Sequence, residues 1–386
     1  MKQCFLALAA VAALAACSDR PTPLEPVSAS VSGVELARRG GSRTGAAFAL
    51  TNAVAGNAVA VFARDRDGAL SLTGTVATGG LGTGGGLSNQ GALVLDDERR
   101  FLFVVNAGSD DISVLALTAG GPVLRDRVPS GGDRPVSLTL RDNLLYVVNA
   151  GSDNIAGFRV SRSGALTPLA GSVRALSGAG TGPAQVSFTP DGNALVVTER
   201  LSNKITTFTL GKDGLSTKTT INASHGETPF GFDFSKRGTL FVSEAFGGMP
   251  DASAASSYDV TKRGTIEVIS GSVPTTETAA CWLILSHDGR YAYVANTGSG
   301  SVTVYRVTQR GRLERIDEDG RAAETGAGTA PADMALSKDG RFLYVRAGGV
   351  AGGGAVFGFA VHGDGTLSPL GSAGGLPAGA IGLVAW

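Results

Sequence analysis

Two glutamates at matching positions of neighbouring sequence segments are the side chains best suited to chemistry. Glu199 and Glu244 each end a short apolar run and precede a turn, and Asn149 and Asn296 end two similar runs. Carboxylates can activate water as general bases, and together with amide oxygens they can hold a hard divalent cation such as Ca²⁺. The four residues are therefore candidate metal ligands, and the two glutamates are candidate catalytic residues.

Four further side chains are candidates for contacting a substrate. Gln185, Trp282 and Asp333 lie near the start of other apolar runs, and Arg200 directly follows Glu199. Gln185 and Arg200 can polarise a carbonyl group. Trp282 can either stack on a ligand or fill a channel, and the sequence leaves both alternatives open.

These residues belong to a unit that recurs seven times between residues 46 and 386. Three copies match almost position for position, namely DERRFLFVVNAGSDDISVLAL from Asp97, RDNLLYVVNAGSDNIAGFRV from Arg141 and HDGRYAYVANTGSGSVTVYRV from His287. The unit recurs roughly every 50 residues, and its apolar runs and turns fit four strands. Four strands per unit are typical of a propeller blade. We therefore predict an all-β, seven-bladed β-propeller with four antiparallel strands per blade.

The two ends of the repeat region predict how the ring closes. The first copy begins at its second strand, and the chain ends in AIGLVAW, a single strand with no successor. Residues 380–386 should therefore supply the inner strand of the N-terminal blade. This closure leaves no exposed sheet edge.

The propeller prediction places the candidate residues relative to the central channel. The inner strand of each blade leads away from one mouth of the channel, and the second strand returns to that mouth. The starts of inner strands and the ends of second strands therefore meet there. We expect Glu199, Glu244, Gln185, Trp282 and Asp333 at this mouth.

Composition and motifs exclude several other functions. The 33 basic and 33 acidic side chains give no net charge, which argues against a nucleic-acid partner. Residues 80–85 fit the spacing G-x-G-x-x-G, but no helical pattern follows, so we interpret them as a loop. His225, His287 and His362 fall in predicted loops, which disfavours a histidine-based metal cluster or catalytic triad. Cys281 is interpreted as a small buried residue.

Residues 1–17 are typical of a secretory signal. Lys2 precedes an apolar stretch from Cys4 to Ala16, which is too short to cross a hydrocarbon layer of ~30 Å as a helix. The stretch continues into Cys17 as Leu-Ala-Ala-Cys, which resembles the lipobox of bacterial lipoproteins, in which the cysteine is lipidated. An ordinary signal peptide cleaved near Ala16 is the alternative.

Both interpretations place the protein outside the cytoplasm. Residues 18–45 are rich in Pro, Ser, Gly and charge without a sustained period, so we expect a flexible tether. We therefore predict an extracytoplasmic protein that is attached to a bacterial membrane only by the lipid on Cys17.

The repeats and two internal strings resemble the seven-bladed lactonase family, which includes bacterial 6-phosphogluconolactonase and fungal carboxymuconate lactonizing enzyme. The strings are LVVTERLSNKITTF and GPAQVSFTPDG, and the resemblance covers residues 46–386. In that family a Pro-Arg-His sequence at one inner strand and a Glu at the end of the next strand are associated with the site. Here Gln185 follows Pro and Ala in place of the Arg and His, and Glu199 matches the Glu.

Two functions follow from this combination. In the first, the protein is a lactonase-like hydrolase in which Glu199, together with Glu244, activates water directly or through a divalent cation. In the second, the lipid-anchored propeller is a non-catalytic module that binds a protein or glycan, through the channel mouth or a predicted long loop, GGMPDASAASSY from Gly247. We expect a monomer in either case, and in the first case the partner is a small lactone.

Overall fold

The computed structural model describes residues 45–350 and 353–386. The predicted signal peptide, Cys17 and the predicted tether lie outside this range, except for Gly45, which begins the first strand. In the described part of the chain, no helix has the length and apolarity that spanning a bilayer requires.

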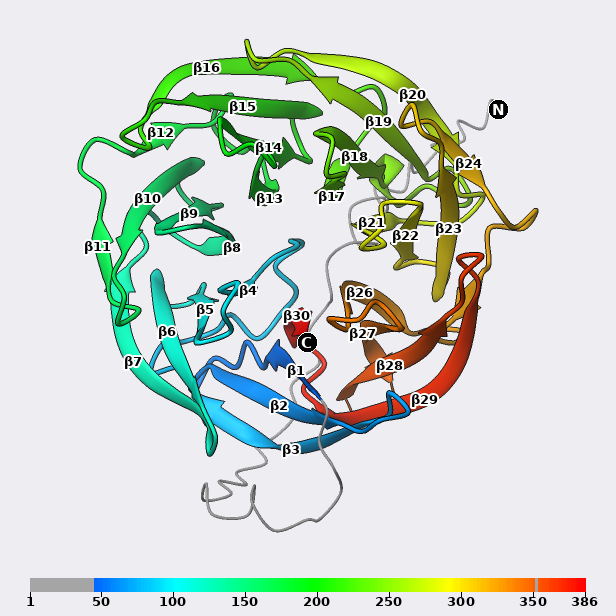
Figure 1. Cartoon of the computed structure of the whole chain (residues 1–386), viewed down its shortest axis with the longest axis horizontal. Coiled ribbons are helices and arrows are strands. Elements are labelled where there is room, and N and C mark those ends of the chain that lie inside the picture. The colour runs from blue at the N-terminus through cyan, green and yellow to red at the C-terminus, as the bar shows by residue number, and fades with distance from the viewer. Residues whose placement is uncertain (1–44, 351–352) are drawn as a thin grey trace, which may run out of the picture.

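Seven antiparallel sheets surround a central channel as the blades of a propeller (Figure 1). This arrangement confirms the predicted all-β, seven-bladed fold. From the inner to the outer strand, blade 1 comprises β30 (Ile381–Ala385), β1 (Gly45–Leu50), β2 (Ala58–Arg64) and β3 (Leu70–Ala77). Blade 2 comprises β4 (Leu93–Leu95), β5 (Phe101–Asn106), β6 (Asp111–Thr118) and β7 (Gly121–Pro129).

The outer strand of blade 3 and of blade 6 is divided into two short segments. Blade 3 comprises β8 (Pro135–Arg141), β9 (Leu144–Asn149), β10 (Asn154–Val160), β11 (Leu166–Pro168) and β12 (Arg174–Ala175). Blade 6 comprises β21 (Ala280–Leu285), β22 (Tyr291–Asn296), β23 (Ser301–Val307), β24 (Leu313–Arg315) and β25 (Ala323–Glu324).

The remaining three blades have four strands each. Blade 4 comprises β13 (Pro183–Phe188), β14 (Ala194–Glu199), β15 (Lys204–Leu210) and β16 (Ser216–Ala223). Blade 5 comprises β17 (Pro229–Phe234), β18 (Thr239–Glu244), β19 (Ala254–Val260) and β20 (Ile266–Pro274), with a short 3-10 helix, η2 (Phe246–Gly248), after β18. Blade 7 comprises β26 (Ala330–Leu336), β27 (Phe342–Val350), β28 (Gly353–Val361) and β29 (Leu367–Leu376).

Burial explains why the second strands are continuously apolar whereas the outer strands alternate. All six residues of β5, FLFVVN, and of β9, LLYVVN, are buried, because each second strand is covered by neighbouring blades on both faces. The outer strand β16, STKTTINA, exposes most of its side chains at the perimeter of the ring. The core of the molecule therefore lies between the blades.

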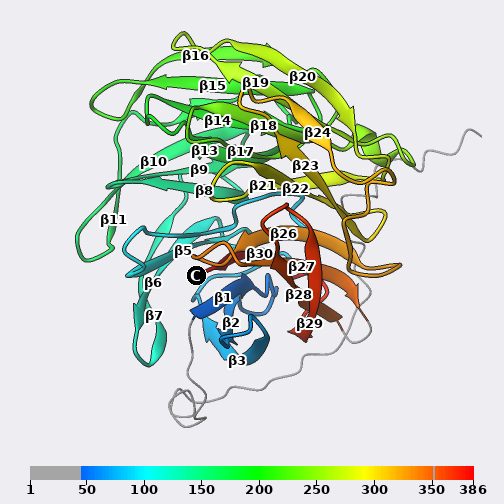
Figure 2. The same ribbon diagram turned by 45° about the vertical axis from the view of Figure 1, so that its right-hand side comes forward.

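The C-terminal strand closes the ring as predicted. β30 pairs antiparallel with β1, with Phe48 opposite Val384 and Leu50 opposite Ile381. Figure 2 shows β30 between β1 and β26, so the last strand of the chain forms the inner edge of the first blade. The ring of Trp386 lies 5.1 Å from the ring of Phe48, measured between centroids.

The prediction of a long loop from Gly247 is wrong for the second half of that segment. Ala254–Val260 is strand β19, which pairs with β18 so that Ala254 lies opposite Glu244. Ala and Ser have low strand propensity, which hides this strand in the sequence. In the structure their small side chains are buried, which allows the strand to pack inside the blade.

Candidate functional site

A β-bulge near the start of several inner strands marks the predicted substrate-contacting residues. The pairing register shifts immediately before Gln185 in β13 and Trp282 in β21, and across Asp333 in β26. Bulges change the direction in which a side chain points and are frequent near functional sites. The three side chains therefore leave the regular alternation of their strands at the same level of the channel.

A cavity of about 310 Å³ occupies the channel below these bulges. We call it the channel cavity. Its walls are the inner strands of blades 1, 2, 3, 4 and 7, and its size suits a small metabolite. Its apolar lining includes Leu93, Leu138, Leu140, Met334 and Leu383. Its polar lining comprises Gln90, Thr139, Gln185, Ser187 and Asp333.

The segment that links β3 to β4 closes the upper mouth, the end of the channel where the inner strands begin. Figure 1 shows this segment reaching into the centre of the ring. We call residues 86–91 the channel plug. The Gln90 side chain donates to the carbonyl oxygen of Leu283 at 2.9 Å and accepts from its backbone N–H at 3.1 Å, while the Gln90 N–H donates to Ala184 at 3.0 Å. The plug therefore reaches across the channel from blade 2 and satisfies otherwise unpaired polar groups on the inner strands of blades 4 and 6.

A second, much smaller cavity lies between the plug and the channel wall. It has a volume of about 20 Å³, and Ser88, Asn89, Trp282, Asp333 and Arg346 are among its lining residues. This space holds about one water molecule, and the polar lining offers that water several hydrogen-bond partners. Asp333 lines both cavities, so this residue borders the water-sized space as well as the channel cavity.

Asp333 is buried, and its environment controls its ionisation. Its carboxylate accepts backbone N–H groups from Gly91 in the plug and Gly382 in β30. Both glycines have left-handed backbone, with φ of 83° and 65°, which only glycine adopts without strain. Burial raises the pKa of Asp333 to about 7, although the positive charge of Arg346 and the two N–H groups act in the opposite direction. Near neutral pH the carboxyl group therefore both loses and accepts a proton readily.

Asp233 is a useful comparison on another inner strand. Burial raises the pKa of Asp233 to about 6, although its carboxylate accepts backbone N–H groups from Leu285 and Phe234. Its contact with Leu285 ties blade 5 to blade 6. Asp233 lines neither of the two cavities, so of these two buried aspartates only Asp333 meets the channel space.

Gln185 and Trp282 mainly hold the channel wall together. The Gln185 side chain donates to the carbonyl oxygen of Phe232 at 2.9 Å and accepts from its N–H at 2.7 Å, which ties β13 to β17. The indole N–H of Trp282 donates to the carbonyl oxygen of Asn89 in the plug at 2.7 Å. The Trp282 ring, 5.0 Å from that of Phe230, therefore fills the upper mouth beneath the plug.

The Glu199 side chain does not face the channel mouth, contrary to the prediction. It has no exposed surface, and its carboxylate accepts hydrogen bonds from the N–H and hydroxyl of Ser177, the hydroxyl of Ser202 at 2.8 Å and the hydroxyl of Thr206 at 2.6 Å. Ser177 lies on the loop that enters blade 4, and Thr206 lies on the third strand. The carboxylate is therefore turned toward the third strand and binds the incoming loop.

Glu244 has the equivalent place in blade 5. Its carboxylate accepts from the N–H of Gly226 at 3.0 Å and from the hydroxyls of Tyr258 at 3.3 Å and Ser272 at 2.7 Å, and it too is fully buried. Gly226 again lies on the loop that enters the blade. The expected placement of Glu244 at the channel mouth is therefore wrong for the same reason, because a buried connecting loop needs polar partners.

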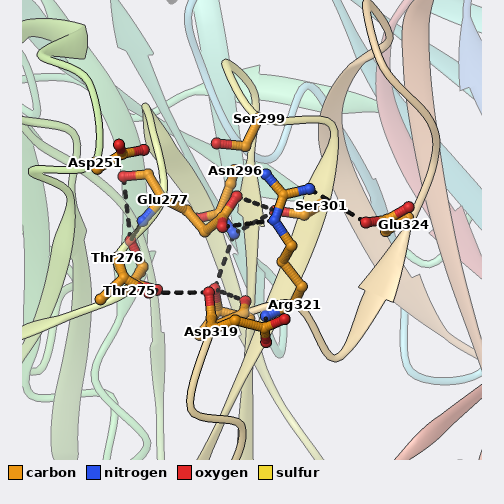
Figure 3. Close-up of polar contacts among 12 residues, drawn as sticks. Asp251, Thr275, Thr276, Glu277, Asn296, Ser299, Ser301, Asp319, Arg321 and Glu324 are labelled. Carbon is orange, nitrogen blue, oxygen red and sulfur yellow. Dashed lines mark hydrogen bonds and ion pairs between the residues drawn. The ribbon is translucent and has the colours of Figure 1, made fainter.

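Asn149 and Asn296 anchor the same type of network in blades 3 and 6. Asn149 donates to the side-chain oxygen of Asn154 at 2.8 Å and to the carbonyl oxygen of Ser130 at 3.4 Å. Figure 3 shows the network of Asn296, which donates to Ser301 and Thr303 at 3.0 and 2.8 Å. In that network Glu277, on the loop that enters blade 6, accepts from Ser301 at 2.8 Å and pairs with Arg321 at 2.9 Å.

The four predicted cation ligands are therefore not brought together. Asn149, Glu199, Glu244 and Asn296 lie in four different blades, and each has its own hydrogen-bond network. Within residues 45–350 and 353–386, no group of three or more His, Cys, Asp or Glu side chains is arranged to hold a metal ion.

The three histidines and Cys281 lie where the sequence interpretation placed them. His225, His287 and His362 are exposed on loops and turns, and each contacts a Ser hydroxyl or a backbone carbonyl. Cys281 is fully buried in β21. None of the four lines the channel cavity.

We expect Glu199→Gln to destabilise the propeller by about 1–3 kcal/mol, because an amide group cannot accept all four hydrogen bonds. Urea denaturation measures this change, with the exposed Glu98→Gln as the matched control, for which we expect less than about 0.5 kcal/mol. A Glu199→Gln protein with unchanged stability and no hydrolytic activity would instead support the catalytic role predicted from the sequence.

Seven blades around a channel with a metabolite-sized cavity define the chain as a β-propeller. The sequence matches the family model described as lactonase, 7-bladed beta-propeller, over residues 54–179, 171–245, 240–329 and 283–373. The chain therefore belongs to this lactonase family. No protein of curated function shows significant sequence similarity to it.

Solved structures share the fold over nearly their whole length. A protein from Lactobacillus plantarum has a TM-score of 0.71 and 20% identity, with 89% of this chain and 99% of that chain covered. The periplasmic gluconolactonase PpgL of Pseudomonas aeruginosa has a TM-score of 0.68 and 18% identity, covering 88% and 98%. A putative 6-phosphogluconolactonase from Bacteroides fragilis has a TM-score of 0.67 and 18% identity, covering 89% and 98%. At this level of identity the likeness shows the fold.

Proposed function

We propose that the protein hydrolyses a lactone bound in the channel cavity, with Asp333 as the general base. Membership of the lactonase family supports the reaction class, and one structural neighbour is named as a gluconolactonase and another as a putative 6-phosphogluconolactonase. The observation that carries the assignment is the position of Asp333. It is a buried aspartate that borders both a cavity for one water and a cavity for a small metabolite.

The proposed reaction uses three groups, namely the Asp333 carboxylate, a water molecule and the lactone. The Asp333 carboxylate takes a proton from a water molecule while the water oxygen attacks the carbonyl carbon of the lactone. The ring C–O bond then breaks, and Asp333 returns the proton to the departing ring oxygen. The product is the open hydroxy acid. The positive charge of Arg346 favours the ionised form of Asp333 that starts the cycle.

The walls of the channel cavity position the ring. Thr139 and Ser187 supply hydroxyl groups, and Gln185 keeps part of its hydrogen-bonding capacity beyond its two bonds to Phe232. Most of the other lining residues are apolar, which suits the hydrocarbon part of a lactone. In this proposal Asp333 replaces Glu199 and Glu244 as the base, and no metal is required.

We also propose that the protein works outside the cytoplasm as a lipid-anchored monomer. The signal-like residues 1–17 and Cys17 support this location, and one structural neighbour is named as periplasmic. The proposal of a non-catalytic binding module loses one of its supports, because half of the predicted loop from Gly247 is strand β19.

The pH dependence of lactone hydrolysis tests the proposal. We expect kcat/KM for at least one small γ- or δ-lactone to rise with pH and to level off above the pKa of Asp333, which burial raises to about 7, because the base must be ionised. The rate is measured by proton release and corrected for spontaneous opening at each pH. Absence of turnover with every lactone, or a rate that does not change across this range, would contradict the proposal.

A further inference from the structure

A pocket of about 300 Å³ lies outside the channel, between blades 1 and 2. We call it the interblade pocket. Its walls come from β1, β2 and β3 of blade 1, from the ends of β6 and β7 in blade 2 with the turn between them, and from Trp386. None of its lining residues lines the channel cavity, so the pocket is separate from the proposed hydrolytic site.

The interblade pocket is lined mainly by apolar side chains. Three of them are aromatic, namely Phe48, Phe62 and Trp386. The Trp386 ring is tilted by 50° against that of Phe48, with 5.1 Å between the centroids. Both phenylalanines are buried, whereas Trp386 is partly exposed. The aliphatic part of the lining comprises Ala46, Val61, Ala63, Leu117 and Pro122.

The polar groups of the lining are already engaged by the backbone. The hydroxyl of Thr73 donates to the carbonyl oxygen of Val61 at 2.9 Å, and the hydroxyl of Thr118 donates to that of Gly121 at 2.8 Å. Among the described residues, none with a charged side chain lines the pocket. An ionised ligand would therefore lose water without gaining a charged partner, whereas an apolar ligand gains by leaving water.

The equivalent space at four other interfaces is filled by a large side chain and a turn. In blades 2, 3, 6 and 7 the second strand begins with a large residue, and a glycine in the turn that leads to the outer strand of the next blade packs against it. The pairs are Phe101 with Gly164, Leu144 with Gly214, Tyr291 with Gly365, and Phe342 with Gly68. The four glycines have φ between 82° and 91°, and a Cβ atom on any of them would collide with the side chain.

Both parts of this filling are smaller between blades 1 and 2. Ala46 pairs with the third strand two positions before the turn, as Phe342 does in blade 7, so alanine takes the place of the large residue. The turn of blade 2, residues 118–121, is one residue shorter than the turn of blade 5, residues 261–265. Ala194 in blade 4 is also small, but it faces the longer turn of blade 5. A small side chain and a short turn together leave the pocket.

We propose that the interblade pocket binds an uncharged aromatic molecule with one or two rings. The ligand takes the place that a large side chain has at the other interfaces, and its ring contacts Phe48 and Trp386, which adds aromatic contacts to the burial of apolar surface. A cavity of about 150 Å³ holds benzene, so a pocket of about 300 Å³ suits one or two rings. This binding does not depend on the proposed hydrolysis.

Iodobenzene is a suitable probe, because its iodine quenches the fluorescence of an indole that it contacts. The chain has two tryptophans, and Trp386 is part of the pocket wall. We expect iodobenzene to quench the fluorescence of the whole protein saturably and to raise its melting temperature, since a ligand of the native state stabilises it. The Trp386→Phe protein should lose the saturable part of the quenching.

Ala46→Phe tests whether the probe binds in this pocket. The ring of the new side chain should fill the space, so we expect a higher melting temperature without the probe and no saturable quenching. Ala46→Leu is a second variant with a smaller side chain, and it should weaken the binding. The exposed Val173→Phe is the matched control and should keep the response of the original protein.

Two results would overturn the proposal. One is the absence of saturable quenching in the original protein, which is the result expected if residues before Gly45 cover the pocket. The other is quenching that stays unchanged in folded Ala46→Phe and Ala46→Leu proteins, because the probe would then bind elsewhere.

Discussion

Asp333→Asn should abolish lactone hydrolysis in a protein that still folds. We expect kcat to fall by about 10²–10⁴-fold, the usual contribution of a general base, because an amide cannot accept a proton from water. The fold should persist, since asparagine has nearly the same size and its oxygen still accepts an N–H from Gly91 or Gly382. Burial of Asp333 already favours an uncharged side chain at this position.

Asp233→Asn is the matched control for this experiment. Asp233 is also a buried inner-strand aspartate with a raised pKa, but it lines neither cavity. We expect its substitution to leave kcat within about twofold of the original value. Steady-state rates compare the activity of the two variants, and a thermal melt of each variant shows whether it is folded. Equal losses of activity in both variants, or full activity in Asp333→Asn, would show that Asp333 is not the base.

Removal of the C-terminal strand should prevent folding altogether. Without residues 381–386, β1 has an unpaired edge at the channel, and Phe48 loses its contact with Trp386. Ile381 and Leu383 are buried, and burial of each such side chain stabilises a fold by about 1.5–3 kcal/mol. Asp333 also loses the N–H of Gly382. Together these losses approach the whole stability of an ordinary domain, about 5–15 kcal/mol.

Circular dichroism measures the effect of this truncation. We expect no cooperative thermal transition after removal of residues 381–386. A chain that lacks only Trp386 keeps the β30–β1 pairs and should retain a transition at a lower temperature. A sharp transition in the longer truncation would mean that the other blades are stable without closure.

The sequence was sufficient to predict the fold because each blade repeats the same burial pattern. The repeat also identified Gln185, Trp282 and Asp333 as residues at one level of the channel, where β-bulges place them. Side-chain direction at a strand end does not follow from its place in the repeat. For this reason the prediction put Glu199 and Glu244 at the channel mouth, whereas their partners lie on the third strand and the incoming loop.

Two parts of the candidate site were missed for different reasons. The plug has no periodic pattern, and its role depends on contacts with strands far away in the chain, so local sequence does not reveal it. Arg346 had a detectable signal. It occupies the position of the second strand where Val105, Val148 and Ala295 stand in other blades, and a charge at an apolar repeat position indicates a special environment.

The plug also affects the order in which the molecule can assemble. Gln90 bonds to Leu283, 193 positions later in the chain, so blade 2 cannot complete its contacts until blade 6 has formed. The pairing of β1 with β30 likewise waits for the last residues of the chain. Such long-range contacts slow folding, because the entropy of closing long loops is lost before the contacts form. The propeller should therefore fold late and as one unit after synthesis, a behaviour compatible with the export that our proposed location outside the cytoplasm requires.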